Sequence, residues 1–275
     1  MAVKGIIFDY SGTLSIGAVL FASPGRLAEE LRRSGLGDLG VTTPAVFWDQ
    51  IVNPTWERGS TTAVGYKKVM AQRVAEVFGR EPSAVSLPVS RFVDAYFEQS
   101  KIDVRWWPLL KTLAADPSAK TIIASDHYAE ATDVIAGCLT QMGIRTVSVR
   151  DATGRNPDVS FFIANSADIG FPKTTERYWH TVRGLIRQES LMGLFIVDDF
   201  GANEQPGDSY ARNEKVTIRR QQTVDILEKV FAVEVESFPF ILTARDPDGG
   251  VDDQSYRTLI SEASARVTRY LNREP

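Results

Sequence analysis

The fold is decided by an N-terminal stretch that reads VKGIIFDYSGT, residues 3–13. Its short apolar run stops at the carboxylate of Asp9, a pattern typical of a buried strand in a parallel sheet. Ser11 and Gly12 then begin a turn that continues through Thr13. Ligands of open α/β sheets bind beyond the carboxyl ends of the strands. Asp9 is therefore expected where the chemistry of this protein takes place.

Further strands and helices follow in alternation, which predicts an α/β fold with a doubly wound parallel sheet. Expected strands are 121–125, 145–149, 161–164 and 194–199, and expected helices are 129–142, 175–189 and a final one over 253–272. Residues 246–250 read DPDGG and predict a turn or a mobile loop.

A helical insertion is expected between the first two strands of the core. Helical spacing begins after Ser23-Pro24 and recurs over 43–53, 60–79 and 82–101, with Gly35 and Gly79 as helix ends and a turn at 57–59. We therefore predict an α/β core, residues 1–16 and 104–275, and a helical cap domain, residues 17–103.

Composition limits the class of protein and its partners. The chain has 275 residues, 43% of them hydrophobic and 24% charged, with a net charge of −4, which is ordinary for a soluble globular protein. Nucleic-acid binding requires clustered basic residues, so no nucleic-acid partner is expected. The lone cysteine, Cys138, excludes an internal disulfide. No apolar run is long enough to span a bilayer and no leader is seen, so we expect a cytoplasmic protein without a membrane partner.

Reactive groups recur at the ends of the expected strands. Asp9, Ser125 and the pair Asp198-Asp199 each end a strand, and Lys173 lies in a loop before the last of these strands. The ends of parallel strands can converge at one edge. Three carboxylates there form a hard oxygen site suited to Mg²⁺, while a hydroxyl and an ammonium bind phosphate oxygens. A carboxylate nucleophile splits a difficult displacement into two steps.

The order of these groups resembles the haloacid dehalogenase (HAD) superfamily, which includes many phosphatases. The resemblance rests on four segments, each in the family's order and beside an expected strand or loop: residues 8–14 (FDYSGTL), 122–125 (IIAS), 168–173 (DIGFPK) and 196–203 (IVDDFGAN). It covers most of the core, from residue 4 to about 205. The family's helical cap has the same place and type as the insertion.

The resemblance implies a role for each matching residue. Asp9 is the implied nucleophile, Thr13 fixes the first loop, Ser125 binds the transferred group and Lys173 neutralises charge. The implied cofactor is Mg²⁺, bound by Asp9, the carbonyl of Ser11 and Asp199, with Asp198 and Asn203 in support. Gly12, Asp126 and His127 are the candidate substrate-binding residues.

Ser11 departs from the family's phosphatases, which carry an acid–base aspartate at this position. A serine hydroxyl has too high a pKa for that role, and acid–base help is typically worth ~10²–10⁴-fold in rate. His127 is a candidate substitute, against the alternative that it faces solvent at a helix start. Lys67 and Lys68 in the cap are candidates for the Schiff-base lysine of a phosphonate hydrolase.

The leading expectation is a hydrolase that acts on a small phosphorylated or phosphonate metabolite through an aspartyl intermediate. One alternative is a metal-independent 2-haloacid dehalogenase. The other is a silenced relative that binds a ligand or a partner.

Overall fold

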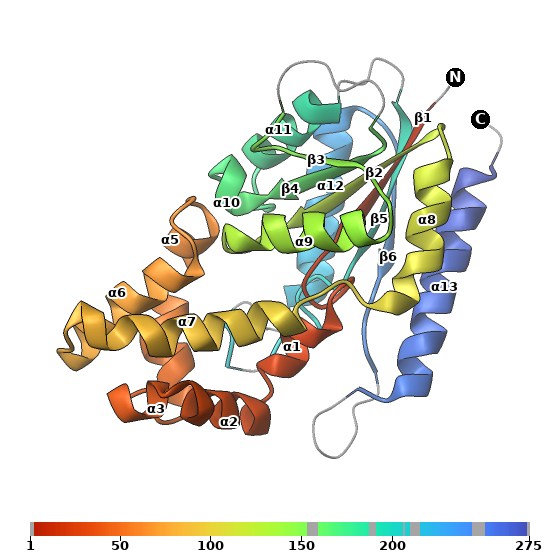
Figure 1. Ribbon diagram of the computed structural model, residues 1–275. Coiled ribbons are helices and arrows are strands. Elements are labelled where there is room, and N and C mark those ends of the chain that lie inside the picture. The colour runs from red at the N-terminus through yellow and green to blue at the C-terminus, as the bar shows by residue number, and fades with distance from the viewer. Residues whose placement is uncertain are drawn as a thin grey trace.

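A six-stranded parallel sheet forms the centre of the molecule (Figure 1). The computed structural model describes residues 3–152, 159–186, 191–205, 207–209, 215–243 and 251–273. The expected loop at 246–250 lies outside this part of the chain. The strands are β1 (Val3–Asp9), β2 (Ala119–Ser125), β3 (Thr146–Ser148), β4 (Phe161–Asn165), β5 (Leu191–Asp198) and β6 (Val235–Pro239).

In the strand order β3-β4-β2-β1-β5-β6, β1 lies at the topological switch point of the sheet. The chain adds strands on the β2 side of β1 and later adds β5 and β6 on its other side. In open α/β sheets this switch point opens a crevice at the carboxyl ends of the strands. Asp9, the last residue of β1, lies there.

Helices cover both faces of the sheet and create two separate apolar layers. Alternate β1 residues point to opposite faces: Ile6 and Phe8 pack with one layer, and Ile7 packs with the other. The first layer is formed by α8 (Trp107–Ala115), α9 (Glu130–Gln141) and α13 (Asp253–Leu271), and the second by α11 (Glu176–Ile186) and α12 (Val216–Phe231). The predicted α/β class with a parallel sheet is confirmed.

Seven of the eight α-helices between β1 and β2 project from one end of the sheet in Figure 1, and the eighth, α8, packs on the sheet. The seven are α1 (Ile16–Phe21), α2 (Pro24–Ser34), α3 (Leu36–Leu39), α4 (Pro44–Val46), α5 (Trp56–Ser60), α6 (Tyr66–Phe78) and α7 (Pro82–Gln99). Gly35 and Gly79 end α2 and α6 in the left-handed conformation, as predicted. The domain boundaries at residues 16 and 104 stay a prediction.

One local expectation was wrong: residues 57–59 were expected to form a turn but lie within α5. The helical spacing expected over 43–53 and 60–79 corresponds to helical structure with interruptions. In the structure α4 passes into a π-helical turn over Phe47–Val52, and residues 61–65 separate α5 from α6. The edge strand β6 was not predicted, because its residues 235–239 (VESFP) mix glutamate and serine with apolar residues and end in proline.

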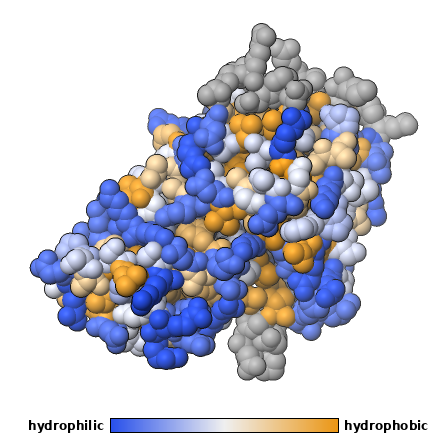
Figure 2. Space-filling view, in the orientation of Figure 1, coloured by the Kyte–Doolittle hydropathy of each residue, from blue (hydrophilic) through white to orange (hydrophobic). Residues whose placement is uncertain are grey.

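The surface in the orientation of Figure 1 is mostly hydrophilic, with apolar atoms in scattered patches (Figure 2). The exposed large apolar side chains of the described residues come from four separate places in the sequence: Leu87, Val104, Met192 and Ile218. Scattered single residues of this kind are normal on a protein surface. Over the described residues, no helix combines the length and the apolarity that crossing a bilayer requires.

Candidate functional site

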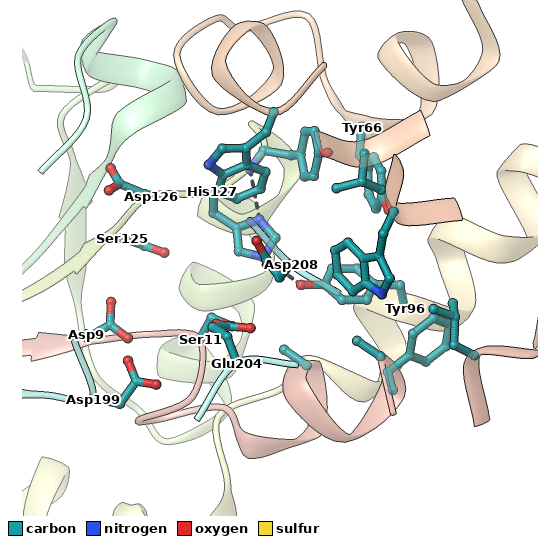
Figure 3. Close-up of a pocket in the computed structure, with 18 of the residues that line it drawn as sticks. Asp9, Ser11, Tyr66, Tyr96, Ser125, Asp126, His127, Asp199, Glu204 and Asp208 are labelled. Atoms are coloured by element: carbon teal, nitrogen blue, oxygen red, sulfur yellow. Dashed lines mark hydrogen bonds between the residues drawn. The ribbon is translucent and has the colours of Figure 1, made fainter. Parts of the chain in front are cut away.

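Three neighbouring strands deliver side chains to one pocket. Asp9 ends β1, Ser125 ends β2 and Asp198 ends β5, and β1 pairs in parallel with both of the others. All three residues line the pocket, together with Asp126 and Asp199, which directly follow β2 and β5. Figure 3 shows Asp9, Ser125, Asp126 and Asp199 along one side of it. The sequence-based expectation that these groups converge is thus met in the geometry.

Asp9, Asp198 and Asp199 form a buried carboxylate cluster. Each has at most 6% of its surface exposed, and one oxygen from each lies within 4.8 Å of the others. The Lys173 ammonium donates hydrogen bonds to Asp9 Oδ1 and, at 3.1 Å, to Asp198 Oδ2. Lys173 comes from the loop before α11 and is itself buried. One ammonium therefore faces three carboxylates.

Burial strongly affects the ionisation of this carboxylate cluster. It raises the pKa of Asp9 well above its usual value; Lys173 opposes this shift, while Asp198 and Asp199 add to it. Burial, and next the charge of Asp198, raise the pKa of Asp199 to about 7. Like charges this close need a proton or a cation between them. A hard divalent cation such as Mg²⁺ fits this all-oxygen donor set.

The loop after β1 approaches the Asp199 carboxylate too closely for a side chain. Gly12 has φ +77, and a Cβ at this position would lie 2.6 Å from Asp199 Oδ2. The next residue, Thr13, is fully buried, and its Oγ1 accepts a hydrogen bond from Asp199 N–H at 3.1 Å. These two residues connect the loop after β1 with the loop after β5, and the role of Thr13 in fixing the first loop stays a prediction.

Asn203 links three loops through its side chain. Its Nδ2 donates to the carbonyls of Gly12 and Phe240, both at 2.8 Å, and its Oδ1 accepts from Leu242 N–H at 2.9 Å. Its backbone N–H donates to Asp199 Oδ2 at 2.8 Å. Asn203 thus orients the Asp199 carboxylate, and its support of a bound metal ion stays a prediction.

Ser11 has a carboxyl partner that sequence reasoning missed. Ser11 Oγ donates a hydrogen bond to Glu204 Oε1 at 3.0 Å, and both residues line the pocket beside Asp9 (Figure 3). Burial raises the pKa of Glu204 well above its usual value, and Asp208 and Asp199 add to the shift. The sequence signal for Glu204 was its position directly after the last segment that resembles the HAD superfamily, which ends at Asn203. A carboxylic acid is therefore present next to the position at which the serine replaces one.

Asp126 and His127 both line the pocket, but in different ways. Asp126 Oδ1 accepts the backbone N–H of Lys173 at 2.8 Å and so holds the lysine loop. His127 is only 2% exposed, so the alternative of a solvent-facing histidine was wrong. Its Nδ1 accepts the N–H of Tyr128 at 2.8 Å, and its Nε2 lies 2.8 Å from the hydroxyl of Tyr96.

The environment of His127 does not favour the acid–base role considered from the sequence. Burial lowers its pKa to about 4, so the ring is neutral near pH 7. Because Nδ1 accepts a hydrogen bond, the neutral ring carries its proton on Nε2 and donates it to Tyr96. Both ring nitrogens are thus engaged with protein groups.

The far side of the pocket is an aromatic wall. Consecutive rings of this wall have centroids 3.9 to 5.8 Å apart, and every ring lines the pocket. In spatial order they are Trp56, Tyr128, Tyr66, Tyr96, Phe21, Phe92, Phe47 and Trp48. All except Tyr128 come from the helices and turns between β1 and β2.

Two lysines considered from the sequence lie elsewhere. Lys67 and Lys68 are on α6 and are not among the pocket-lining residues. The ammonium of Lys67 pairs with Asp94 at 2.5 Å on the surface. Lys173 is the one lysine among the described residues that line the pocket.

Comparison with known proteins gives structural matches only. No family model matches the sequence, and no curated protein matches it. A HAD-like family hydrolase from Porphyromonas gingivalis matches with a TM-score of 0.51 and 14% identity, over 100% of each chain. A 2-haloacid dehalogenase from Pseudomonas syringae pv. Tomato DC3000 matches with a TM-score of 0.47 and 14% identity, over 76% of this chain and 83% of its own.

The full-length match to the Porphyromonas protein, with the six-stranded parallel sheet, shows that this chain has the haloacid dehalogenase-like fold. At this level of identity the match establishes the fold, and function has to be argued from the site.

Proposed function

We propose that this protein, with its haloacid dehalogenase-like fold, is a Mg²⁺-dependent hydrolase of small phosphorylated substrates, with Asp9 as the nucleophile. The observation that carries the proposal is the carboxylate cluster. A carboxylate at the end of β1 faces the pocket, beside two further buried carboxylates and one ammonium. This set of groups suits the transfer of a phosphoryl group to an aspartate and then to water.

The bound cation would be held by the carboxylates of Asp9, Asp198 and Asp199 with the carbonyl of Ser11. It would supply charge neutralisation for the phosphoryl oxygens. Lys173 adds a second positive group beside Asp9. The hydroxyl of Ser125, which ends the neighbouring strand and lines the pocket, would donate to a phosphoryl oxygen.

In the first step an Asp9 carboxylate oxygen attacks phosphorus, and the bond from phosphorus to the leaving oxygen breaks. Glu204 gives its proton to that oxygen, so the product leaves as an alcohol. In the second step water attacks the aspartyl phosphate while the Glu204 carboxylate takes a proton from it, which releases phosphate and restores both residues. The Ser11–Glu204 hydrogen bond of 3.0 Å supports this assignment, because it fixes the carboxyl group beside the nucleophile.

The alternatives from the sequence receive less support. A 2-haloacid is itself a carboxylate, and three carboxylates with one lysine would repel it in the absence of a metal ion. A Schiff-base route needs a lysine from the helices between β1 and β2, and the described residues that line the pocket include none from there.

Phosphate release from a panel of phosphomonoesters, with Mg²⁺ or with EDTA, tests the proposal. Phosphonoacetaldehyde and 2-haloacids belong in the same panel. We expect phosphate release that requires Mg²⁺ and is lost in Asp9→Asn. The matched control is Asp225→Asn, an exposed aspartate on α12 that should leave the rate unchanged. Halide release that survives EDTA, or a rate that Asp9→Asn does not change, would contradict the proposal.

A further inference from the structure

The part of the pocket that the inserted helices form is apolar. The aromatic wall makes up most of it, and the other lining residues from between β1 and β2 are aliphatic: Ala18, Ala22, Leu27 and Val52. No charged side chain from the described residues 16–103 lines the pocket. In Figure 3, Ser11 and Glu204 lie between Asp9 and Tyr96. A substrate with its phosphoryl group at Asp9 therefore places its leaving group against an apolar surface.

A π-helical turn contributes side chains to this surface. In the π-helical segment the N–H of Asn53 donates to the carbonyl of Trp48. Phe47, Trp48 and Val52 all line the pocket, whereas the polar residues 49–50 are exposed. π-Helical turns are rare and frequently lie at functional sites. The inserted helices thus contain a local irregularity whose apolar side chains line the pocket.

The charges of the pocket favour an uncharged group at the wall. Lys173 is the one cationic side chain among the described lining residues, and it already pairs with two carboxylates of the cluster, so an anionic group would find no partner at the wall. Glu204 carries a proton in the proposed first step, and Asp208 has an interaction partner within the protein. Neither is therefore a free carboxylate that would select a cationic group. Burial of a charge without a partner is costly.

We propose that the aromatic wall binds an uncharged aromatic ring of the substrate, which makes the substrate a phosphate monoester of an alcohol that carries such a ring. The inference rests on the proposed function, because the phosphoryl group of the same molecule lies at Asp9. The rings of the wall contact one another edge-to-face and, for Tyr66 and Tyr128, in a parallel stack. A further ring can pack in either way, which favours it over a saturated ring by about 2- to 10-fold.

A polar or a very small leaving group fits the wall less well. A sugar would give up the hydration of several hydroxyl groups, and the aliphatic and phenyl side chains of this surface offer no hydrogen bonds in return. An ethyl group would leave most of the apolar surface uncovered. Burial of a phenyl ring in its place is worth about 10- to 100-fold in affinity.

Binding of 2-phenylethanol, measured by calorimetry without any phosphoryl group, tests the inference independently of turnover. The comparison ligands are 2-cyclohexylethanol, which has a saturated ring of the same size, and glycerol, which is polar. We expect 2-phenylethanol to bind about 2- to 10-fold more tightly than 2-cyclohexylethanol, and glycerol to bind least.

Two variants of the wall should weaken the binding of 2-phenylethanol. Ala22 is half-buried and lines the pocket, so the ring of Ala22→Phe would take up space beside the wall and reduce affinity by about tenfold or more. Trp56→Leu removes one aromatic partner and should reduce affinity by about 2- to 10-fold. Circular dichroism of each variant shows whether the protein is folded.

Matched controls carry the same substitutions away from the pocket. Ala45→Phe changes an exposed alanine of α4, and Trp107→Leu removes a half-buried tryptophan that does not line the pocket. Both should leave the binding of 2-phenylethanol unchanged. Binding of glycerol as tight as that of 2-phenylethanol, or 2-phenylethanol binding that survives both Ala22→Phe and Trp56→Leu, would overturn the inference.

Turnover then separates the inference from the function on which it rests. The kcat/KM for 2-phenylethyl phosphate should exceed that for ethyl phosphate by about 10- to 100-fold, and this ratio should fall towards 1 in Ala22→Phe. Selective binding of 2-phenylethanol without hydrolysis of any phosphate would support the aromatic site and refute the proposed function. Hydrolysis that favours sugar phosphates, or that does not distinguish the phenylethyl from the ethyl ester, would support the function and refute the aromatic site.

Discussion

Replacement of Glu204 by glutamine tests how a protein with serine at position 11 handles the proton. Glutamine has nearly the same shape, and its amide oxygen can still accept the hydrogen bond that Ser11 Oγ donates at 3.0 Å. The change therefore removes the transferable proton and leaves the contact. Acid–base help is worth ~10²–10⁴-fold, so kcat for an alkyl phosphate should fall by about that factor.

The leaving group gives the assay its internal control. An alkoxide needs a proton as it departs, whereas a nitrophenolate does not. In Glu204→Gln the first step on p-nitrophenyl phosphate, read as the pre-steady-state burst of nitrophenolate, should slow by about tenfold or less. Steady-state phosphate release and this burst can be measured on the same protein samples.

Two further variants sharpen the interpretation. Ser11→Ala removes only the hydrogen bond to Glu204 and should cost a few-fold in rate, about the effect of one hydrogen bond. Glu228→Gln, an exposed residue of α12, should have no effect. An alkyl phosphatase rate that is unchanged in Glu204→Gln would refute the acid–base assignment, as would equal losses on the alkyl substrate and in the nitrophenolate burst.

Four other predictions follow from the same site. Because burial raises the pKa of Asp199 to about 7, the metal-free protein should lose stability as the pH rises from about 4 to 7, and Mg²⁺ should restore that stability. Melting temperatures at pH 5 and pH 8, with and without Mg²⁺, would show this effect. A metal-free protein that is more stable at pH 8 than at pH 5 would contradict it. Mg²⁺ affinity measured by calorimetry should accordingly fall by about tenfold per pH unit below 7 for each proton released. Lys173→Met leaves a buried carboxylate pair without its cation and should cost about 3–5 kcal/mol in urea unfolding, whereas Lys229→Met on the surface should cost less than about 1 kcal/mol. Gly12→Ala forces a left-handed residue and a 2.6 Å approach to Asp199, so Mg²⁺ affinity should be lost in calorimetry even where circular dichroism shows a folded protein.

The sheet and the carboxylate cluster were predictable from the sequence for one physical reason. Strands β1, β2 and β5 are buried on both faces, so they appear as apolar runs, and each run ends at a polar residue. Parallel pairing then brings the ends of neighbouring strands together. Asp9, Ser125 and Asp198 could be assigned to one edge without knowledge of any distance.

The remainder of the pocket depends on tertiary placement. The rings of Trp48, Trp56 and Tyr66 have the composition of any apolar core, and only the docking of the inserted helices turns them towards Asp9. Glu204 lies in a loop, where a charged residue is ordinary, and its raised pKa comes from burial that no local pattern indicates. The burial of His127 could likewise not be predicted from a local pattern, because it results from packing among aromatic residues.

The central position of β1 has a consequence for how the protein reaches its folded state. Asp9 meets Lys173 across 164 positions of sequence, and Gly12 meets Asn203 across 191. Loop closure over such separations is slow, and non-local pairing of parallel strands delays folding. During synthesis β1 emerges with both edges unpaired; its partner on one edge, β2, follows at residues 119–125, but its partner on the other edge, β5, follows only at residues 191–198. An apolar strand in that state is prone to aggregation. The topology places the strand of the proposed nucleophile at the centre of the sheet. As a result, β1 is the strand that remains without one of its two pairing partners for the longest part of synthesis.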